Sequence, residues 1–152
     1  MPKSKPSRIH EFDPKRLLDG IVARKVPISK HAETMRIPRI DGWEPGRVWT
    51  TWEIDPDIVS PQGSIFGGYL SAVSDEMVGM ATLSVIEEGE AFVTADLRVN
   101  FFRPAVAGTL NAEATVIHKG RSIAHVEAVF TNAEGKLVAK ASATQMIRRE
   151  NS

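Results

Sequence analysis

The sequence predicts an α+β fold in which one long helix packs against an antiparallel sheet. Three observations indicate it: a long proline-free stretch with apolar residues at helical spacing, four β-type runs after it, and short turns between those runs. Parallel strands need crossover connections of about a dozen residues or more, which such turns cannot supply. One helix must therefore cover one sheet.

The central helix is expected from about Gly67 to Ile86. Large apolar residues recur there at helical spacing and indicate the face that packs on the core: Leu70, Val73, Met77, Met80 and Ala81. The opposite side carries small residues, Ser71, Ala72 and Gly79 among them, which let another backbone approach closely. This small face predicts that a second subunit completes the structure.

Five β-type runs, one before the helix and four after it, cover about residues 47–53, 91–103, 108–118, 122–132 and 136–148. In the run after the helix, five apolar residues alternate with polar ones: Val93, Ala95, Leu97, Val99 and Phe101. This alternation predicts that the apolar set faces the core and that Thr94 lies on the other face. Turns at Gly120 and Gly135 predict hairpins, so the last four runs are expected to form an antiparallel meander.

Composition narrows the class of protein. A chain of 152 residues with 42% hydrophobic content is the size of one domain with its own core. It has no cysteine, which excludes disulfides, a cysteine nucleophile and cysteine-ligated zinc. His118 and His125 lack a second ligand at metal spacing, so no metal site is predicted. No segment has the apolar length of a signal sequence or membrane span, so a cytoplasmic protein is expected.

The net charge is zero, but the two signs are unevenly distributed. Residues 1–40 carry ten Lys or Arg against four Asp or Glu, and the remainder carries nine against fifteen. Asp13 and Pro14 predict the start of a short helix that continues to about Lys25. We therefore expect a basic N-terminal arm over residues 1–40 and one main domain over residues 41–150.

The basic residues of the arm are scattered and lack interleaved aromatic residues, which does not favour contact with nucleic acid or a membrane. Two interpretations of the arm remain. It lies as a solvated segment on its own acidic domain, or it supplies positive charge to a phosphate-rich ligand.

Gly67 and Gly68 stand at the entry to the central helix. Unpaired N–H groups at a helix start lie at the positive end of the helix dipole, where they can hold a carbonyl oxygen that gains negative charge. Glycine also permits a ligand to approach the backbone. A turn into a helix alone can equally require such a pair, so both interpretations stand at this point.

Over residues 43–147 several motifs in order resemble the phenylacetate-pathway (PaaI-like) type of hot-dog acyl-CoA thioesterases. They are Gly67-Gly68 at the helix entry, Asp75 within the helix, the strand end Phe101-Phe102-Arg103-Pro104, and the turn residues Gly120-Arg121-Ser122. The resemblance implies a hot-dog fold and a homo-oligomer, dimer or tetramer, with the site between two subunits. It implies hydrolysis of an acyl-CoA to a carboxylic acid and coenzyme A, with no separate cofactor.

The same resemblance implies roles for individual residues. The N–H of Gly67 polarises the thioester carbonyl with Gly68 beside it, Asp75 is the nucleophile or general base, and Thr94 positions the attacking water. Where the family has His and Asn, this chain has Phe66 and Ser60. Phe66 cannot hydrogen-bond the thioester but can line an apolar acyl pocket. These departures keep open an alternative, a protein that binds acyl-CoA without hydrolysing it.

The residues themselves also single out Asp75, which lies mid-helix with no lysine four residues away to pair with. Glu76 points toward the edge of the apolar stripe and is the weaker candidate. Arg103, Lys119 and Arg121 stand at strand ends or turns. Long cationic side chains there can reach the phosphates of coenzyme A, or they are ordinary charged turn residues.

Overall fold

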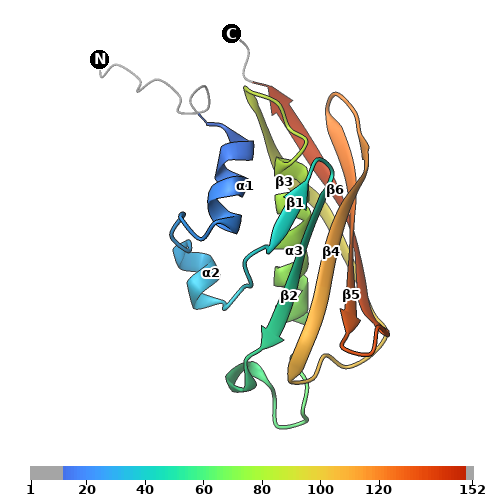
Figure 1. Cartoon of the computed structure of the whole chain (residues 1–152). Helices are drawn as coiled ribbons and strands as arrows, with labels where there is room; N and C mark the ends of the chain where they lie inside the picture. Colours follow the sequence, from blue (N-terminus) through green and yellow to red (C-terminus); the bar gives the residue numbers. More distant parts are fainter. Residues whose placement is uncertain (1–11, 150–152) are drawn as a thin grey trace, which may run out of the picture.

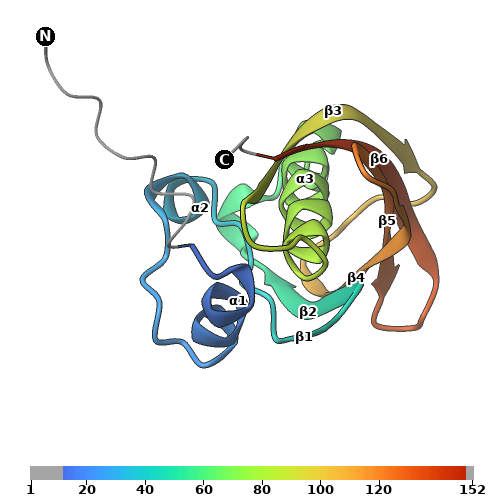
Figure 2. The same ribbon diagram turned by 90° about the horizontal axis from the view of Figure 1, so that it is seen from above.

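The computed structural model describes residues 12–149. Six strands form one antiparallel sheet: β1 (Gly42–Glu44), β2 (Arg47–Ile54), β3 (Glu90–Phe101), β4 (Gly108–Lys119), β5 (Ile123–Asn132) and β6 (Leu137–Arg149). The sheet curls around one long helix, α3 (Gly67–Leu83), as Figures 1 and 2 show. The predicted α+β hot-dog fold is confirmed.

The spatial order of the strands is β1-β2-β4-β5-β6-β3. Strands β4, β5 and β6 form the expected meander, with turns at Gly120 and Gly135. The prediction that all four late strands form one meander is wrong for β3, which pairs with β6 and lies at the sheet edge. The reason is that both sides of β4 are occupied, by β2 and β5.

The core lies between α3 and the concave face of the sheet. The predicted helix stripe is buried there at Leu70, Val73, Met77 and Ala81, while Met80 is half-buried. Alanine fills many of the helix-facing positions of the central strands: Ala112, Ala114, Ala124, Ala128, Ala139, Ala141 and Ala143. Such small side chains let the helix lie close to the sheet, which positions the side of α3 against β3.

The pairing of β3 with β6 shifts register at Ala95, which forms a β-bulge. Thr94 stands opposite the buried Gln145 and therefore faces the helix, whereas Val93 stands opposite the exposed Met146 and is itself 55% exposed. The predicted faces of Val93 and Thr94 are thus reversed, because an extra residue in one strand exchanges its two faces. Beyond the bulge the predicted alternation holds, at Leu97, Val99 and Phe101.

Two short helices precede the sheet. In α1 (Pro14–Val22) the Asp13 carboxylate accepts hydrogen bonds from the N–H groups of Lys15 and Arg16, so the predicted cap is confirmed. Helix α2 (Lys30–Thr34) was not predicted. Both lie beside α3 (Figure 2). Within the described residues, no helix is long and apolar enough to cross a membrane.

Candidate active site

Helix α3 runs antiparallel to the edge strand β3. Three contacts mark its course: Gly67 against the ring of Phe101, Asp75 with Thr94, and Gly79 near the ring of Phe92. Because β3 has a partner strand on one side only within the described residues, its contacts with α3 lie at the edge of the sheet. Two of the predicted catalytic residues meet there.

The structure brings Asp75 and Thr94 together. The Thr94 hydroxyl donates to Asp75 Oδ1 at 2.9 Å, and both residues are exposed. The β-bulge at Ala95 makes this contact possible, because unbroken alternation would place Thr94 on the outer face of the sheet. An exposed carboxylate held by one neutral hydroxyl keeps lone pairs free for a proton, as a general base requires.

Gly67 and Gly68 begin α3, after the N-cap residue Phe66. Phenylalanine has no oxygen to accept from the first N–H groups, and its side chain makes no capping hydrogen bond. A Cβ on Gly67 would stand 3.0 Å from Phe101 Cζ, and one on Gly68 would stand 2.7 Å from Phe66 Cε2. The helix start is thus crowded by two aromatic rings and uncapped by any side chain.

A cavity of about 430 Å³ opens at this helix start. Its lining includes Gly67, Phe101, Phe102 and Arg103, so a backbone donor, two aromatic rings and a cation share one site. The Arg103 guanidinium donates to the Leu137 carbonyl at 2.7 Å, which holds the cation at the rim. Three sequence-predicted features therefore meet here: the glycine entry, the aromatic strand end and Arg103.

Phe66 and Ser60 lie outside that lining. The Phe66 side chain is 66% exposed, and its ring meets the Tyr69 ring edge-on. The Ser60 hydroxyl accepts from the Gln62 N–H within its own turn. The expectation that both contact substrate stays a prediction.

Lys119 and Arg121 lie at the other end of β3 from Gly67. Lys119 pairs with the buried Glu90 at 3.1 Å, and Arg149 pairs with the same carboxylate at 2.9 Å. Burial raises the pKa of Glu90, but the Glu87 N–H and the two cations outweigh it and hold the pKa below its usual value. Arg121 is exposed in its turn. One subunit does not bring these cations to Gly67.

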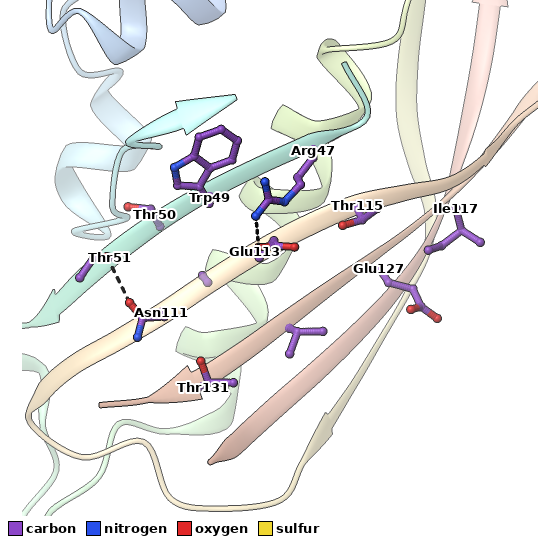
Figure 3. A pocket seen from close by; sticks show the side chains of 12 residues that line it. Arg47, Trp49, Thr50, Thr51, Asn111, Glu113, Thr115, Ile117, Glu127 and Thr131 are labelled. Carbon is purple, nitrogen blue, oxygen red and sulfur yellow. Dashed lines mark hydrogen bonds and ion pairs between the residues drawn. The ribbon is translucent and has the colours of Figure 1, made fainter. Parts of the chain in front are cut away.

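A larger hollow lies elsewhere, on the outer face of the sheet across β2, β4 and β5 (Figure 3). It has a volume of about 620 Å³ and contains none of the predicted site residues. Arg47 donates to Glu113 there at 2.7 Å, which lowers the pKa of Glu113, and Thr51 donates to Asn111. Each charged group on its lining has a partner, since Arg47 pairs with Glu113 and Glu127 pairs with Lys140.

No group of three or more potential metal ligands gathers within residues 12–149. Sequence reasoning missed two features of this part of the molecule. It did not single out Glu90, which anchors an ion-pair cluster, and it did not identify a cavity between α3 and the arm. Neither has a local signal, because both depend on residues far apart in the chain.

The sequence profile of the thioesterase superfamily matches residues 62–139, a span that contains Gly67, Asp75 and Thr94. The chain belongs to the thioesterase superfamily. It is similar to the phenylacetic acid degradation-related protein of Ralstonia eutropha JMP134, with 29% identity and a TM-score of 0.75 over 89% of this chain and 99% of that one.

Two other proteins are similar to this chain. A Saccharolobus solfataricus protein that carries a provisional esterase name is 28% identical over 137 residues, 90% of this chain and 94% of its own length. The Streptococcus mutans UA159 protein smu.793, solved bound to acetyl CoA, is 26% identical with a TM-score of 0.66, over 74% of this chain and 90% of that one.

Proposed function

We propose that this thioesterase-superfamily protein hydrolyses acyl-CoA thioesters to a free carboxylic acid and coenzyme A, with no separate cofactor. The observation that carries the proposal is the hydrogen bond from Thr94 to Asp75, beside a helix that starts with uncapped N–H groups. The acetyl CoA bound to the similar Streptococcus mutans protein supports a coenzyme A thioester as the substrate class.

In the proposed reaction, Asp75 takes a proton from a water molecule whose oxygen attacks the thioester carbonyl carbon. Alternatively, Asp75 attacks directly and water then hydrolyses the mixed anhydride. The Gly67 N–H, at the positive end of the α3 dipole, stabilises the negative charge on the carbonyl oxygen. In both routes the carbon–sulfur bond breaks when the first tetrahedral intermediate collapses, and the coenzyme A thiolate takes up the proton that the attacking water releases.

Helix geometry supports a site shared by two subunits. Gly67 and Asp75 are eight residues apart on α3, which is about 12 Å along a helix that rises 1.5 Å per residue. An oxyanion donor and an attacking group must both lie about 3 Å from neighbouring atoms of one carbonyl. If Asp75 attacks directly, the two residues of a single chain are too far apart to serve the same thioester, and a bridging water adds only about 3 Å of reach. This spacing supports a Gly67 supplied by a partner subunit.

The edge strand β3 supports the geometry of such a pair. It is twelve residues long, with one unpaired edge and the exposed apolar residues Val93 and Phe101. Long edges of this kind favour pairing with another chain. If two copies of β3 pair antiparallel about a twofold axis at Arg98, the bulge at Ala95 shifts the register by one residue. Thr94 then stands opposite the partner subunit's Phe101, the ring that covers Gly67. A dimer, or a dimer of dimers, follows.

The same pairing offers a role to the distant cations. Antiparallel strands exchange ends, so the Lys119 and Arg121 end of one subunit approaches the Arg103 end of its partner. Arg103 and the partner's Arg121 are then the best placed to bind the phosphates of coenzyme A. Lys119 contributes less, because Glu90 already neutralises its charge.

The first test is release of free thiol from short, medium, long and aromatic acyl-CoAs.

The second test is a matched pair of variants at Gly67. Gly67→Pro deletes the N–H while suiting the first helical position, and the extended Phe66 backbone (φ −75°, ψ 153°) tolerates a following proline. Gly67→Ala keeps the N–H and adds a similar bulk against Phe101. We expect roughly 10²–10³-fold lower kcat for Gly67→Pro and a much smaller loss for Gly67→Ala.

The exposed Phe66, in the place of a hydrogen-bonding residue, favours one alternative: a protein that binds acyl-CoA without turnover. Saturable binding of acyl-CoA with no thiol released from any member of the panel would establish this alternative. If Gly67→Pro and Gly67→Ala instead lower kcat equally, the Gly67 N–H has no role in the mechanism. The proposal that the protein hydrolyses acyl-CoA would still stand.

A further inference from the structure

A cavity of about 260 Å³ lies between α3 and the two helices of the arm. Its lining is mostly apolar and includes Leu17, Ile21, Val26, Ile37, Ile40 and Met80. Its charged and imidazole groups are engaged: Arg39 donates to the backbone carbonyls of Ile21 and Val26, and His31 Nε2 lies 3.6 Å from Glu76 Oε2. An apolar cavity with few polar groups is the usual form of a small-molecule site.

The cavity reaches α3 at Glu76, the residue next to Asp75. Between the two carboxylates the helix carries only small side chains. Ala72 and Gly79 each stand three or four positions from both Asp75 and Glu76, so they are surface neighbours of both. They carry only a methyl group and a hydrogen, so the path across α3 from Asp75 to the cavity is a shallow trough, bordered near Gly79 by the ring of Phe92.

We infer that this trough and cavity bind the acyl chain of the substrate, and that the cavity holds its distal end. The inference rests on the proposed function, because it starts the chain at a thioester beside Asp75. It adds the substrate class, which is an unbranched apolar acyl group of medium to long chain length, and it gives the arm a part in substrate selection.

Dimensions set the chain length. Asp75 and Glu76 are separated by 100° around a helix about 10–12 Å wide, so the trough is roughly 9 Å across. An extended chain advances roughly 1.2 Å per bond, as the span of a polypeptide residue indicates, so about seven or eight bonds cross it. The cavity then has room for several more methylene groups, each about the size of a water molecule at roughly 30 Å³. Acyl chains of about 10 to 14 carbons fit, and a butanoyl chain ends before the cavity.

The test fills the cavity from the arm side, away from the reaction centre. Ala32 of α2 lines the cavity and is 9% exposed, so Ala32→Leu adds three carbons to it without changing α3. The matched control is Ala133→Leu, the same change in the exposed β5–β6 turn. We expect Ala32→Leu to lower kcat/KM for dodecanoyl-CoA at least about tenfold and for butanoyl-CoA less than about twofold. Ala133→Leu is expected to change neither value.

A second variant covers failure of Ala32→Leu to fold, which circular dichroism and thermal unfolding would reveal. Ile28 lines the same cavity and is 49% exposed, so Ile28→Ala enlarges it at a tolerant position and should move the preferred chain length upward. Three results with Ala32→Leu would overturn the inference. They are an equal loss of kcat/KM at every chain length, no loss at any chain length, and a change of oligomeric state with an unaltered chain-length profile.

Binding separates this inference from the proposed function. If the wild-type protein releases no thiol from any acyl-CoA, hydrolysis fails as the function, and calorimetry with dodecanoyl-CoA and butanoyl-CoA still tests the cavity. Tighter binding of dodecanoyl-CoA that is lost in Ala32→Leu supports the cavity as the acyl site. Binding of the two ligands with equal affinity, or binding that Ala32→Leu leaves unchanged, contradicts it.

Discussion

Two carboxylates near the edge strand occupy opposite environments. Glu90, at the start of β3, is buried and is held by the Glu87 N–H, Lys119 and Arg149. Asp75, on α3, is exposed and receives one hydrogen bond, from Thr94. Glu90 has its lone pairs committed, so its charge contributes to stability. Asp75 has carboxylate lone pairs that accept no hydrogen bond from the described residues. Only a carboxylate with such free lone pairs can take up a proton during a reaction.

This difference predicts different effects when the charge of each carboxylate is removed. Removing the charge of Asp75 should affect turnover and leave folding intact, whereas removing the charge of Glu90 should affect folding first. The buried carboxylate thus shows that partial burial and nearby charge do not by themselves mark a reactive group. The number of partners that each oxygen already has is the more informative quantity.

The largest expected effect is on turnover in Asp75→Asn. The amide keeps the size of the side chain but removes the base or nucleophile, and general-base assistance is typically worth ~10²–10⁴ in rate. We expect a loss of that size in kcat, with acyl-CoA binding and the unfolding temperature retained. Glu76→Gln is the matched control, because it removes the same charge from the neighbouring position. Full activity in Asp75→Asn with loss in Glu76→Gln would reverse the assignment.

A smaller effect is expected at the partner hydroxyl. Thr94→Val preserves the branched shape of the side chain but deletes the proton donated to Asp75, and a hydrogen bond to a charged group is worth about 1.5–3 kcal/mol. We expect roughly tenfold to hundredfold lower kcat, measured by thiol release, and recovery of most of it in Thr94→Ser. A Thr94→Ser variant as slow as Thr94→Val would indicate that packing, and not the hydroxyl, matters at this position.

At Glu90 the expected effect is on stability. Glu90→Gln leaves Lys119 without its anion and Arg149 paired with Glu87 alone, and removing one member of a buried ion pair is destabilising. Because Arg149 is 56% exposed and Lys119 is 21% exposed, solvent reduces the cost to about 2 kcal/mol. Urea denaturation measures it. The kcat of the folded variant should equal that of the wild type, and a large loss of kcat at full stability would contradict the distinction between the two carboxylates.

The smallest effect is a change of that stability difference with pH. The folded-state pKa of Glu90 is lowered, so its stabilising contribution is present above the ordinary glutamate pKa and is lost as the pH falls through the lowered value. The free energy of unfolding of the wild type should therefore exceed that of Glu90→Gln at pH 7 and approach it below about pH 4. A gap that stays constant over this range would show that Glu90 has the same pKa when folded and unfolded.

Local patterns predicted most of the fold. The Asp13 cap, the helix from Gly67 and the turns at Gly120 and Gly135 each depend on neighbouring residues, and each is found in the structure. Helix α2 was missed because five residues are too few to display a helical period. The pairing of β3 with β6 depends on which strand edges are free, which no local pattern records.

The candidate site was predictable in its residue types but not in its geometry. Asp75 and Thr94 were identified through the family resemblance, yet the alternation in β3 predicted the wrong face for Thr94. A bulge is defined by the partner strand, and the residues around Ala95 alternate without a break, so one strand alone cannot reveal it. The separation of Arg103 from Lys119 along β3 likewise emerges only from the folded chain.

In the proposed enzyme each reaction centre combines Asp75 of one subunit with Gly67 of another, and mixing two inactive variants tests this shared site. Asp75→Asn and Gly67→Pro are unfolded together in equal amounts and refolded, so that half of the dimers contain one subunit of each kind. Every mixed dimer then has one intact centre, and we expect roughly a quarter of the wild-type thiol release to return. A shared site would be contradicted if mixed dimers are shown to be present but the mixture is no more active than the mean of the two variants alone.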